Sequence, residues 1–137
     1  MPETGTIPAP KTKAILLIAH GSRRQEANQE LVELAQRLKQ HQPYPIIEPS
    51  YLELAEPDIV AGGSACVARG AGCVLMVPYF LSAGMHIRRD LTEARDTLRQ
   101  QFPDVEFHLG PPLGPHPLLD ELVCRRISDL DASSVSG

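Results

Sequence analysis

Three side chains that can bind a metal ion or accept a proton follow extended, apolar stretches of the sequence. His20 follows an apolar run at residues 14–19, Glu53 lies near the end of a second extended stretch, and His86 follows a third. Any one of them alone would be read as an orienting hydrogen-bond partner or a salt-bridge residue. Together, two imidazoles and a carboxylate suit a divalent first-row metal ion with open coordination positions. An imidazole also accepts protons near neutral pH, so the set predicts metal binding, proton transfer or both.

A pair of arginines follows each of these two histidines: Arg23 and Arg24, and then Arg88 and Arg89. Guanidinium groups bind carboxylates or phosphates through two parallel hydrogen bonds. The helix that is expected to begin after Ser22 adds its positive dipole end at the same place. Since the net charge of the chain is −4, this local positive charge indicates a polyanionic ligand. Neighbouring helical residues point about 100° apart, so one arginine of each pair is expected to be only solvated.

The elements that must position these residues alternate between extended and helical patterns. Strands are expected at residues 14–19, 46–54, 73–80 and 105–109. Apolar residues at helical spacing follow each of them. This βαβαβαβα order predicts a three-layer α/β sandwich, with four parallel strands in the order 2-1-3-4 and helices on both faces. Ligands bind beyond the carboxyl ends of such strands, where the candidate residues lie.

The expected helix ends carry local signals. Ser22 and Gln25 have the spacing of a capping box, and Pro57 suits the first turn of a second helix. His116 is expected to cap a last helix that Pro117 opens, and a role for it at the site stays open. The apolar residues of that last helix are expected to face inward: Leu118, Leu122, Val123, Ile127 and Leu130.

With 137 residues the chain has the length of one domain. We expect a disordered arm at residues 1–12, a domain at 13–130 and a flexible tail at 131–137.

The cysteines, Cys66, Cys73 and Cys124, form no metal-binding pair and are expected to be buried thiols. No stretch is long enough to cross a bilayer, and no signal peptide is expected. These features favour a cytoplasmic protein, and the net charge argues against a nucleic-acid binder.

Motifs of other enzyme classes are missing. The sequence contains neither of the Gly-rich phosphate loops, G-x-x-x-x-G-K-[ST] and G-x-G-x-x-G, and no G-x-S-x-G elbow. A histidine phosphatase also places its nucleophile in a His-Gly motif after a strand, but that family has Arg immediately before the histidine. This chain has Ala19 there, which makes a phosphatase the weaker alternative.

Four blocks of the sequence resemble the class II tetrapyrrole chelatases. They are residues 16–24 (LLIAHGSRR), 51–59 (YLELAEPDI), 77–91 (VPYFLSAGMHIRRDL) and 109–119 (LGPPLGPHPLL). The chain is most similar to the short, single-lobe form of the sirohydrochlorin chelatase family, the CbiX/SirB group, over residues 13–130. The order and spacing of four separate blocks make the resemblance specific.

The resemblance implies an enzyme that inserts cobalt or ferrous iron into sirohydrochlorin for cobalamin or sirohaem synthesis. It implies no nucleotide and no cofactor beyond the substrate metal ion. The metal-site histidines of the family fall on His20 and His86, and its glutamate falls on Glu53. These three are expected to hold the metal, and His20 is the first candidate to accept a pyrrole proton. The substrate is expected to be bound by Ser22, Arg23, Arg24, Ser82, Gly84, Arg88 and Arg89.

Larger class II chelatases resemble two such lobes in one chain. We therefore expect a homodimer that restores the two-lobed shape, with a sirohydrochlorin-type tetrapyrrole and a divalent metal as its ligands. Neither a nucleic acid nor a membrane is expected as a partner. A non-catalytic metal or tetrapyrrole carrier would use the same residues and remains the main alternative.

Overall fold

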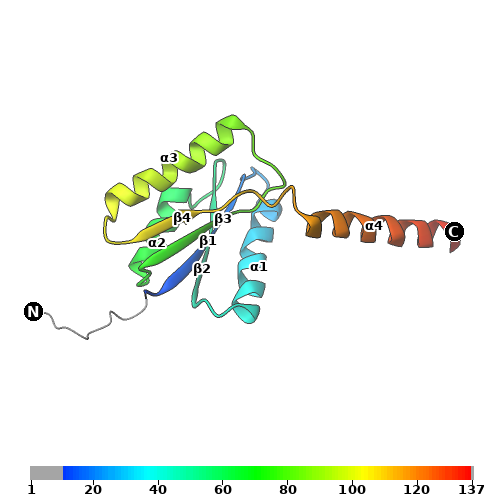
Figure 1. The fold of residues 1–137 in the computed structure, drawn as a ribbon, viewed down its shortest axis with the longest axis horizontal. Helices are drawn as coiled ribbons and strands as arrows, with labels where there is room; N and C mark the ends of the chain where they lie inside the picture. The colour runs from blue at the N-terminus through cyan, green and yellow to red at the C-terminus, as the bar shows by residue number, and fades with distance from the viewer. Residues whose placement is uncertain (1–10, 137) are drawn as a thin grey trace, which may run out of the picture.

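A four-stranded parallel sheet forms the centre of the structure (Figure 1). The computed structural model describes residues 11–136, so residues 1–10 of the expected arm lie outside the described residues. The strands are β1 (Lys13–Ala19), β2 (Ile46–Tyr51), β3 (Cys73–Pro78) and β4 (Glu106–Leu109). They pair in the order β2-β1-β3-β4, all parallel. The predicted fold class and strand order are confirmed, because apolar runs buried on both faces are typical of parallel strands.

Helices cover both faces of the sheet. Three helices do so, α1 (Gln25–His41), α2 (Ile59–Ala68) and α3 (Met85–Gln101), and a fourth, α4 (Pro117–Ser136), follows β4. Successive side chains of a strand point to opposite faces. Ile15 and Leu17 of β1 accordingly pack with α1, whereas Leu16 and Ile18 pack with α2 and α3. Two hydrophobic cores thus fix the sheet between α1 on one side and α2 with α3 on the other (Figure 1).

The starts of the first two helices differ from the expectation. The prediction of a capping box at Ser22 and Gln25 is wrong, because α1 begins at Gln25 and no side chain caps its first turn. Ser22 Oγ instead accepts a hydrogen bond from the Arg24 N–H at 3.0 Å. In α2, Asp58 is the N-cap residue, and its carboxylate accepts from the Ala61 N–H at 2.8 Å.

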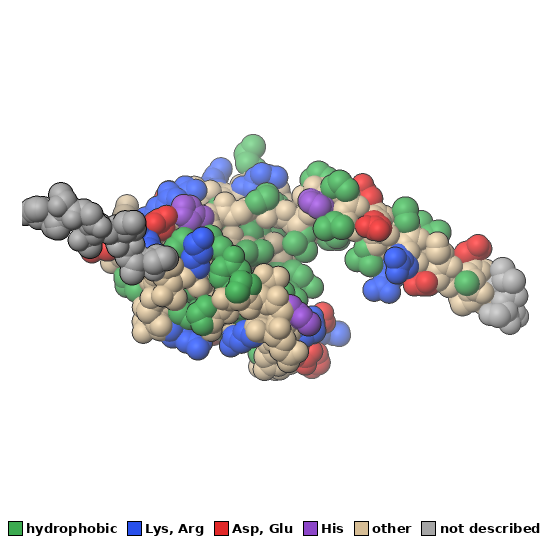
Figure 2. Space-filling model, turned by 60° about the horizontal axis from the view of Figure 1, so that its bottom comes forward, with side chains coloured by type: hydrophobic (Ala, Val, Ile, Leu, Met, Phe, Trp, Pro, Cys, Tyr) green, Lys and Arg blue, Asp and Glu red, His purple; other side chains and the backbone are tan. Residues whose placement is uncertain are grey.

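Helix α4 leaves the domain and contacts none of the other helices and strands (Figure 1). The expectation that its apolar residues face inward is wrong, since all five are exposed; Figure 2 shows hydrophobic side chains along the projecting helix. Residues 131–136, expected to be a flexible tail, continue the helix. His116 caps it as predicted, because its Nδ1 accepts from the Leu118 N–H at 3.0 Å. No helix in residues 11–136 has the length and apolar character to cross a membrane.

The cysteines divide into two environments. Cys66 and Cys73 are buried as expected, whereas Cys124 is exposed on α4, which corrects the prediction for that residue. Burial raises the pKa of the Cys66 thiol to about 12, so this cysteine stays protonated and unreactive at neutral pH.

We expect Leu98→Ala to destabilise the fold strongly. Leu98 is fully buried, and its methyl groups lie where a Cβ on Gly63 of α2 would come within 2.6 Å, so it fills the close contact between α2 and α3. Truncation leaves a cavity and should lower the free energy of unfolding by about 2–5 kcal/mol. Chemical denaturation measures this change. Gln100→Ala, on the exposed side of the same helix, should change it by less than about 0.5 kcal/mol; equal effects would contradict the packing.

Candidate functional site

The backbone pairing of β1 with β2 continues past the ends of both strands and brings His20 beside Glu53. The Leu52 N–H donates to the Ala19 carbonyl at 2.9 Å, and the Glu53 N–H donates to the His20 carbonyl at 3.1 Å. Gly21 makes this approach feasible. Its φ is +100°, and a Cβ there would lie 1.7 Å from the Glu53 carbonyl oxygen. Any side chain at this position would push the two segments apart.

The side chains of His20 and Glu53 meet at this edge. His20 Nε2 lies 3.3 Å from Glu53 Oε2, and the two side chains are 54% and 58% exposed. An exposed pair of this kind contributes little to stability. The His20–Glu53 pair matters for chemistry rather than for stability, since an imidazole beside a carboxylate can take up a proton or offer two ligand atoms to a metal ion. The sequence prediction that these two residues converge is confirmed.

His86 lies apart from this pair. It is the second residue of α3, follows β3 at the same edge of the sheet, and is exposed. Within residues 11–136, one group of three metal-ligating side chains has its ligand atoms within 4.8 Å of one another, and it does not include His86. His20 and Glu53 therefore form a contact, while His86 is positioned at the same edge without completing a set of three.

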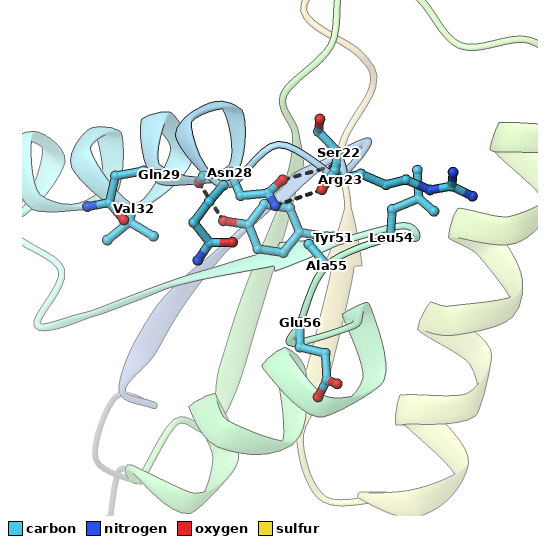
Figure 3. Close-up of a pocket in the computed structure, with 10 residues that line it drawn as sticks. Ser22, Arg23, Asn28, Gln29, Val32, Tyr51, Leu54, Ala55 and Glu56 are labelled. Carbon is cyan, nitrogen blue, oxygen red and sulfur yellow. Dashed lines mark hydrogen bonds between the residues drawn. The ribbon is translucent and has the colours of Figure 1, made fainter.

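A polar network in the segment that follows His20 holds the first turn of α1 against β2 (Figure 3). Asn28 Oδ1 accepts from the Ser22 N–H at 3.0 Å, and Asn28 Nδ2 donates to the Ser22 carbonyl at 2.8 Å. The Tyr51 hydroxyl donates to the Asn28 carbonyl at 2.6 Å, and burial raises the pKa of Tyr51, so the phenol stays protonated. Nothing in the sequence around Asn28 pointed to this role. The network borders a cavity of about 310 Å³ that Arg23 also lines.

The predicted arginines fall into two groups. Arg88 Nε donates to the Ala83 carbonyl at 2.9 Å, so Arg88 holds the loop that contains Ser82 and Gly84. Arg23, Arg24 and Arg89 are exposed, and no described side-chain hydrogen bond or ion pair engages their guanidinium groups. Those three remain available to an anionic ligand, whereas Arg88 first fixes the loop.

Large exposed apolar side chains follow the ends of β2 and β3, a feature that the sequence analysis did not single out. Leu54 follows β2, and Tyr79, Leu81 and Met85 follow β3; all are exposed, Met85 by 76%. Water-exposed apolar side chains that gather at one site commonly mark a ligand or protein contact. Together with the exposed arginines, these side chains suit a ligand that has apolar surface and anionic groups.

Known proteins share this architecture. The crystal structure of the sirohydrochlorin chelatase SirB from Bacillus subtilis subspecies spizizenii in complex with cobalt matches with a TM-score of 0.79 and 34% identity, over 86% of this chain and 50% of that one. A CbiX protein from Marinobacter aquaeolei VT8 matches with a TM-score of 0.73 and 27% identity, over 89% of this chain and 98% of that one. The domain therefore has the fold of the chelatases.

The family model described as CbiX matches residues 14–130, and the chain belongs to the CbiX family. A chloroplastic sirohydrochlorin ferrochelatase of Arabidopsis thaliana is 40% identical over 113 residues, which are 82% of this chain and 50% of the relative. The chain spans about half the length of the first curated relatives that it matches.

We expect Gly21→Ala to separate Glu53 from His20. The added methyl group would collide with the Glu53 carbonyl, and the left-handed backbone of Gly21 is unfavourable for alanine. Affinity for Co²⁺ at this edge, measured by titration calorimetry, should fall by at least about 10-fold, as when a supporting residue of a metal site is lost. Gly110→Ala serves as the control, because its nearest contact, at 3.5 Å, is of ordinary length. Unchanged affinity in Gly21→Ala would contradict the assignment.

Proposed function

We propose that this protein is a sirohydrochlorin chelatase that inserts a divalent metal ion, Co²⁺ or Fe²⁺, into the tetrapyrrole without consuming ATP. The observation that carries the proposal is the contact of His20 with Glu53 at the carboxyl edge of a CbiX-family domain. The relatives named as sirohydrochlorin ferrochelatases and cobaltochelatases support it. The product would enter sirohaem or cobalamin synthesis.

The reaction exchanges one divalent ion for two pyrrole N–H protons, so the site must supply ligands and a proton acceptor. Glu53 Oε2 lies 3.3 Å from His20 Nε2, so the two side chains reach the same point of the edge. A neutral imidazole performs one task at a time, as ligand or as base. In our proposal His20 accepts one pyrrole proton and the second leaves to bulk water, while His86 and Glu53 offer ligand atoms to the incoming metal ion.

The surroundings of the pair suit this substrate. The apolar side chains around the edge, among them Leu81 and Met85, would contact the face of the macrocycle. Arg23, Arg24 and Arg89 would bind the carboxylates at its periphery. Ser82 and Gly84 belong to the loop that Arg88 holds, and we assign all three to the substrate-binding surface.

The proposal places the enzyme in a reducing cytoplasm, and the cysteines are free thiols in the structure.

Catalysis predicts turnover by a small amount of protein. Protein at far lower concentration than sirohydrochlorin should metallate all of it, under anaerobic conditions with Co²⁺ or Fe²⁺, as followed by the visible absorption bands. His20→Ala should lower the rate above the spontaneous reaction by at least about 100-fold, because a general base contributes that much or more. His41→Ala, an exposed histidine at the end of α1, is the matched control and should keep the full rate.

The same assay separates an enzyme from a carrier. A carrier would metallate or bind at most one equivalent per site and then stop. Such a limit in the wild-type protein would contradict the chelatase proposal. Full activity in His20→Ala would instead contradict the site and leave the enzyme class intact.

We further propose that the protein is a homodimer in which α4 packs against a second copy. A groove of about 700 Å³ runs between α4 and the loops beside the site, lined by Leu81, Pro115, Leu119, Val123, Ile127 and Leu130. Burying one such aliphatic side chain is worth roughly 1.5–3 kcal/mol, so an exposed stripe of them favours association. An α4 helix from a second copy has the matching apolar face. Because Leu81 belongs to both surfaces, the dimer would also complete one wall of the site.

Ile127→Glu should disrupt this dimer. A carboxylate on the apolar stripe would have to be buried without a partner, which opposes association. Light scattering should then report the mass of one chain, whereas the wild-type protein should have twice that mass. Ser128→Glu places the same charge on the opposite side of α4, since nine residues at about 100° each put Ser128 about 180° around the helix from Leu119 of the stripe. That variant should remain dimeric, and a monomeric wild-type protein would contradict the proposal.

A further inference from the structure

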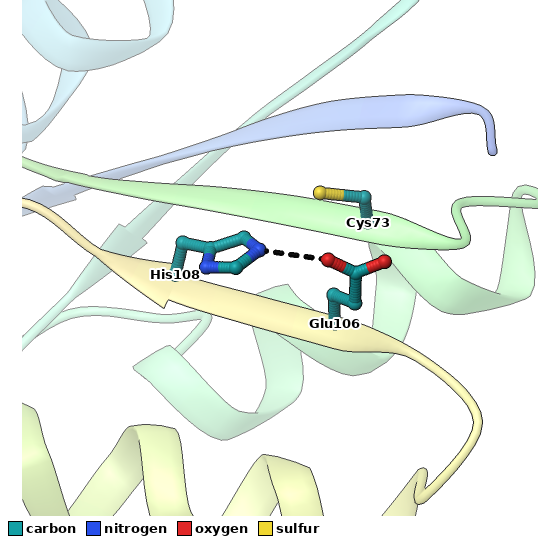
Figure 4. A group of neighbouring side chains, drawn as sticks. All are labelled: Cys73, Glu106 and His108. Atoms are coloured by element: carbon teal, nitrogen blue, oxygen red, sulfur yellow. Dashed lines mark hydrogen bonds and ion pairs between the residues drawn. The ribbon is translucent and has the colours of Figure 1, made fainter. Parts of the chain in front are cut away.

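A second group of metal-ligating side chains lies at the opposite edge of the sheet, where β3 and β4 begin (Figure 4). Cys73 is the first residue of β3 and pairs with Glu106, the first residue of β4. His108 follows two residues later and shares the face of Glu106, because strand side chains alternate. The thiol, carboxylate and imidazole atoms lie within 4.8 Å of one another, a grouping with no equal elsewhere in residues 11–136.

The thiol of Cys73 is buried and lacks a polar partner. Cys73 is 5% exposed, and no hydrogen bond to its sulfur is found within the described part of the chain. Figure 4 shows the sulfur, the Glu106 carboxylate and the His108 ring as the corners of a triangle. A buried cysteine usually packs among apolar groups as a small hydrophobe. Here it faces two side chains that both bind metal ions.

The other two members are arranged as ligands. His108 Nε2 lies 3.0 Å from Glu106 Oε1, and Glu106 Oε2 accepts from Lys11 Nζ at 2.7 Å. Lys11 therefore occupies one carboxylate oxygen and leaves the other directed at the imidazole and the thiol. Carboxylates that bind metals are commonly held in this way by a second hydrogen bond.

We propose that Cys73, Glu106 and His108 bind a divalent first-row metal ion such as Zn²⁺ or Co²⁺. Thiolate, imidazole and carboxylate are the usual ligands of these ions, and three of them leave a fourth position for water. A tetrahedral ion needs ligand atoms roughly 3.3–3.7 Å apart, from metal–ligand bonds of about 2.0–2.3 Å. Glu106 and His108 are about half exposed, so their side chains can make this adjustment. On binding, the thiol loses its proton to solvent, and the ion replaces the hydrogen bond between Glu106 and His108.

This site is separate from the proposed chelation site. Cys73 begins β3, whereas His20, Glu53 and His86 lie at the edge where β3 ends at Pro78. At the usual rise of a strand, the two ends of β3 are roughly 16 Å apart. The bound ion would connect β4, a four-residue strand at the edge of the sheet, to its neighbour β3. It would stabilise the fold, because a ligand that binds only the native state shifts unfolding. The inference does not rest on the proposed function.

Titration with Co²⁺ alone tests this site directly. The protein should carry His20→Ala and His86→Ala, so that the proposed chelation site contributes no signal. Co²⁺ bound to a thiolate gives a sulfur-to-metal charge-transfer absorption in the near ultraviolet, which imidazole and carboxylate ligands do not produce. We expect this band at one Co²⁺ per chain. Cys73→Ser should abolish it, and Cys124→Ser, which removes the exposed cysteine on α4, should leave it intact.

A second variant keeps the test decisive if Cys73→Ser fails to fold. His108→Ala changes a half-exposed side chain and should weaken Co²⁺ binding by at least about 10-fold. Zn²⁺ should also raise the thermal midpoint of the protein with an intact site, and this rise should be lost in His108→Ala. Absence of the thiolate band from folded protein would overturn the proposal. Loss of the band in Cys124→Ser, with retention in Cys73→Ser, would overturn it as well.

Discussion

The arrangement of the edge at which β1 and β2 end depends on one close approach, that of the backbone of Gly21 to the backbone of Glu53. The two segments continue the parallel pairing of their strands for two further hydrogen bonds, from Leu52 to Ala19 and from Glu53 to His20. There is no space for a side chain at Gly21, where a Cβ would overlap the Glu53 carbonyl. A glycine therefore sets the distance between an imidazole and a carboxylate that come from different strands.

The remaining structure supplies what this pair needs around it. The two hydrophobic cores hold the sheet, and the order of its strands places the segments after β1, β2 and β3 at one edge. Asn28 secures the backbone of Ser22, and Arg88 secures the loop after β3. The opposite edge carries a different chemistry, since a buried thiol faces Glu106 and His108 there. One sheet thus separates a proposed site for a substrate metal from a proposed site for a structural one.

The layout of the fold and the meeting of His20 with Glu53 could be predicted from the sequence, whereas features set by the contacts of particular side chains could not. The apolar runs predicted the strands and their order, and the strand ends placed His20 with Glu53. The capping box failed because Ser22 Oγ accepts from the Arg24 N–H and α1 begins only at Gln25. The apolar stripe of α4 was recognised, but periodicity does not show which surface covers it. The Cys73 group depends on the register of β3 with β4, which no local pattern reveals.

The central claim is that the edge after β1 and β2 receives the metal ion that the enzyme inserts. Anomalous X-ray diffraction from crystals soaked in Co²⁺ tests it most directly, because it locates cobalt without reference to activity. The account predicts a cobalt peak at bonding distance, about 2.0–2.2 Å, from an imidazole nitrogen or a carboxylate oxygen of His20, Glu53 or His86. Cobalt bound elsewhere in the crystal, with none at this edge, would contradict it.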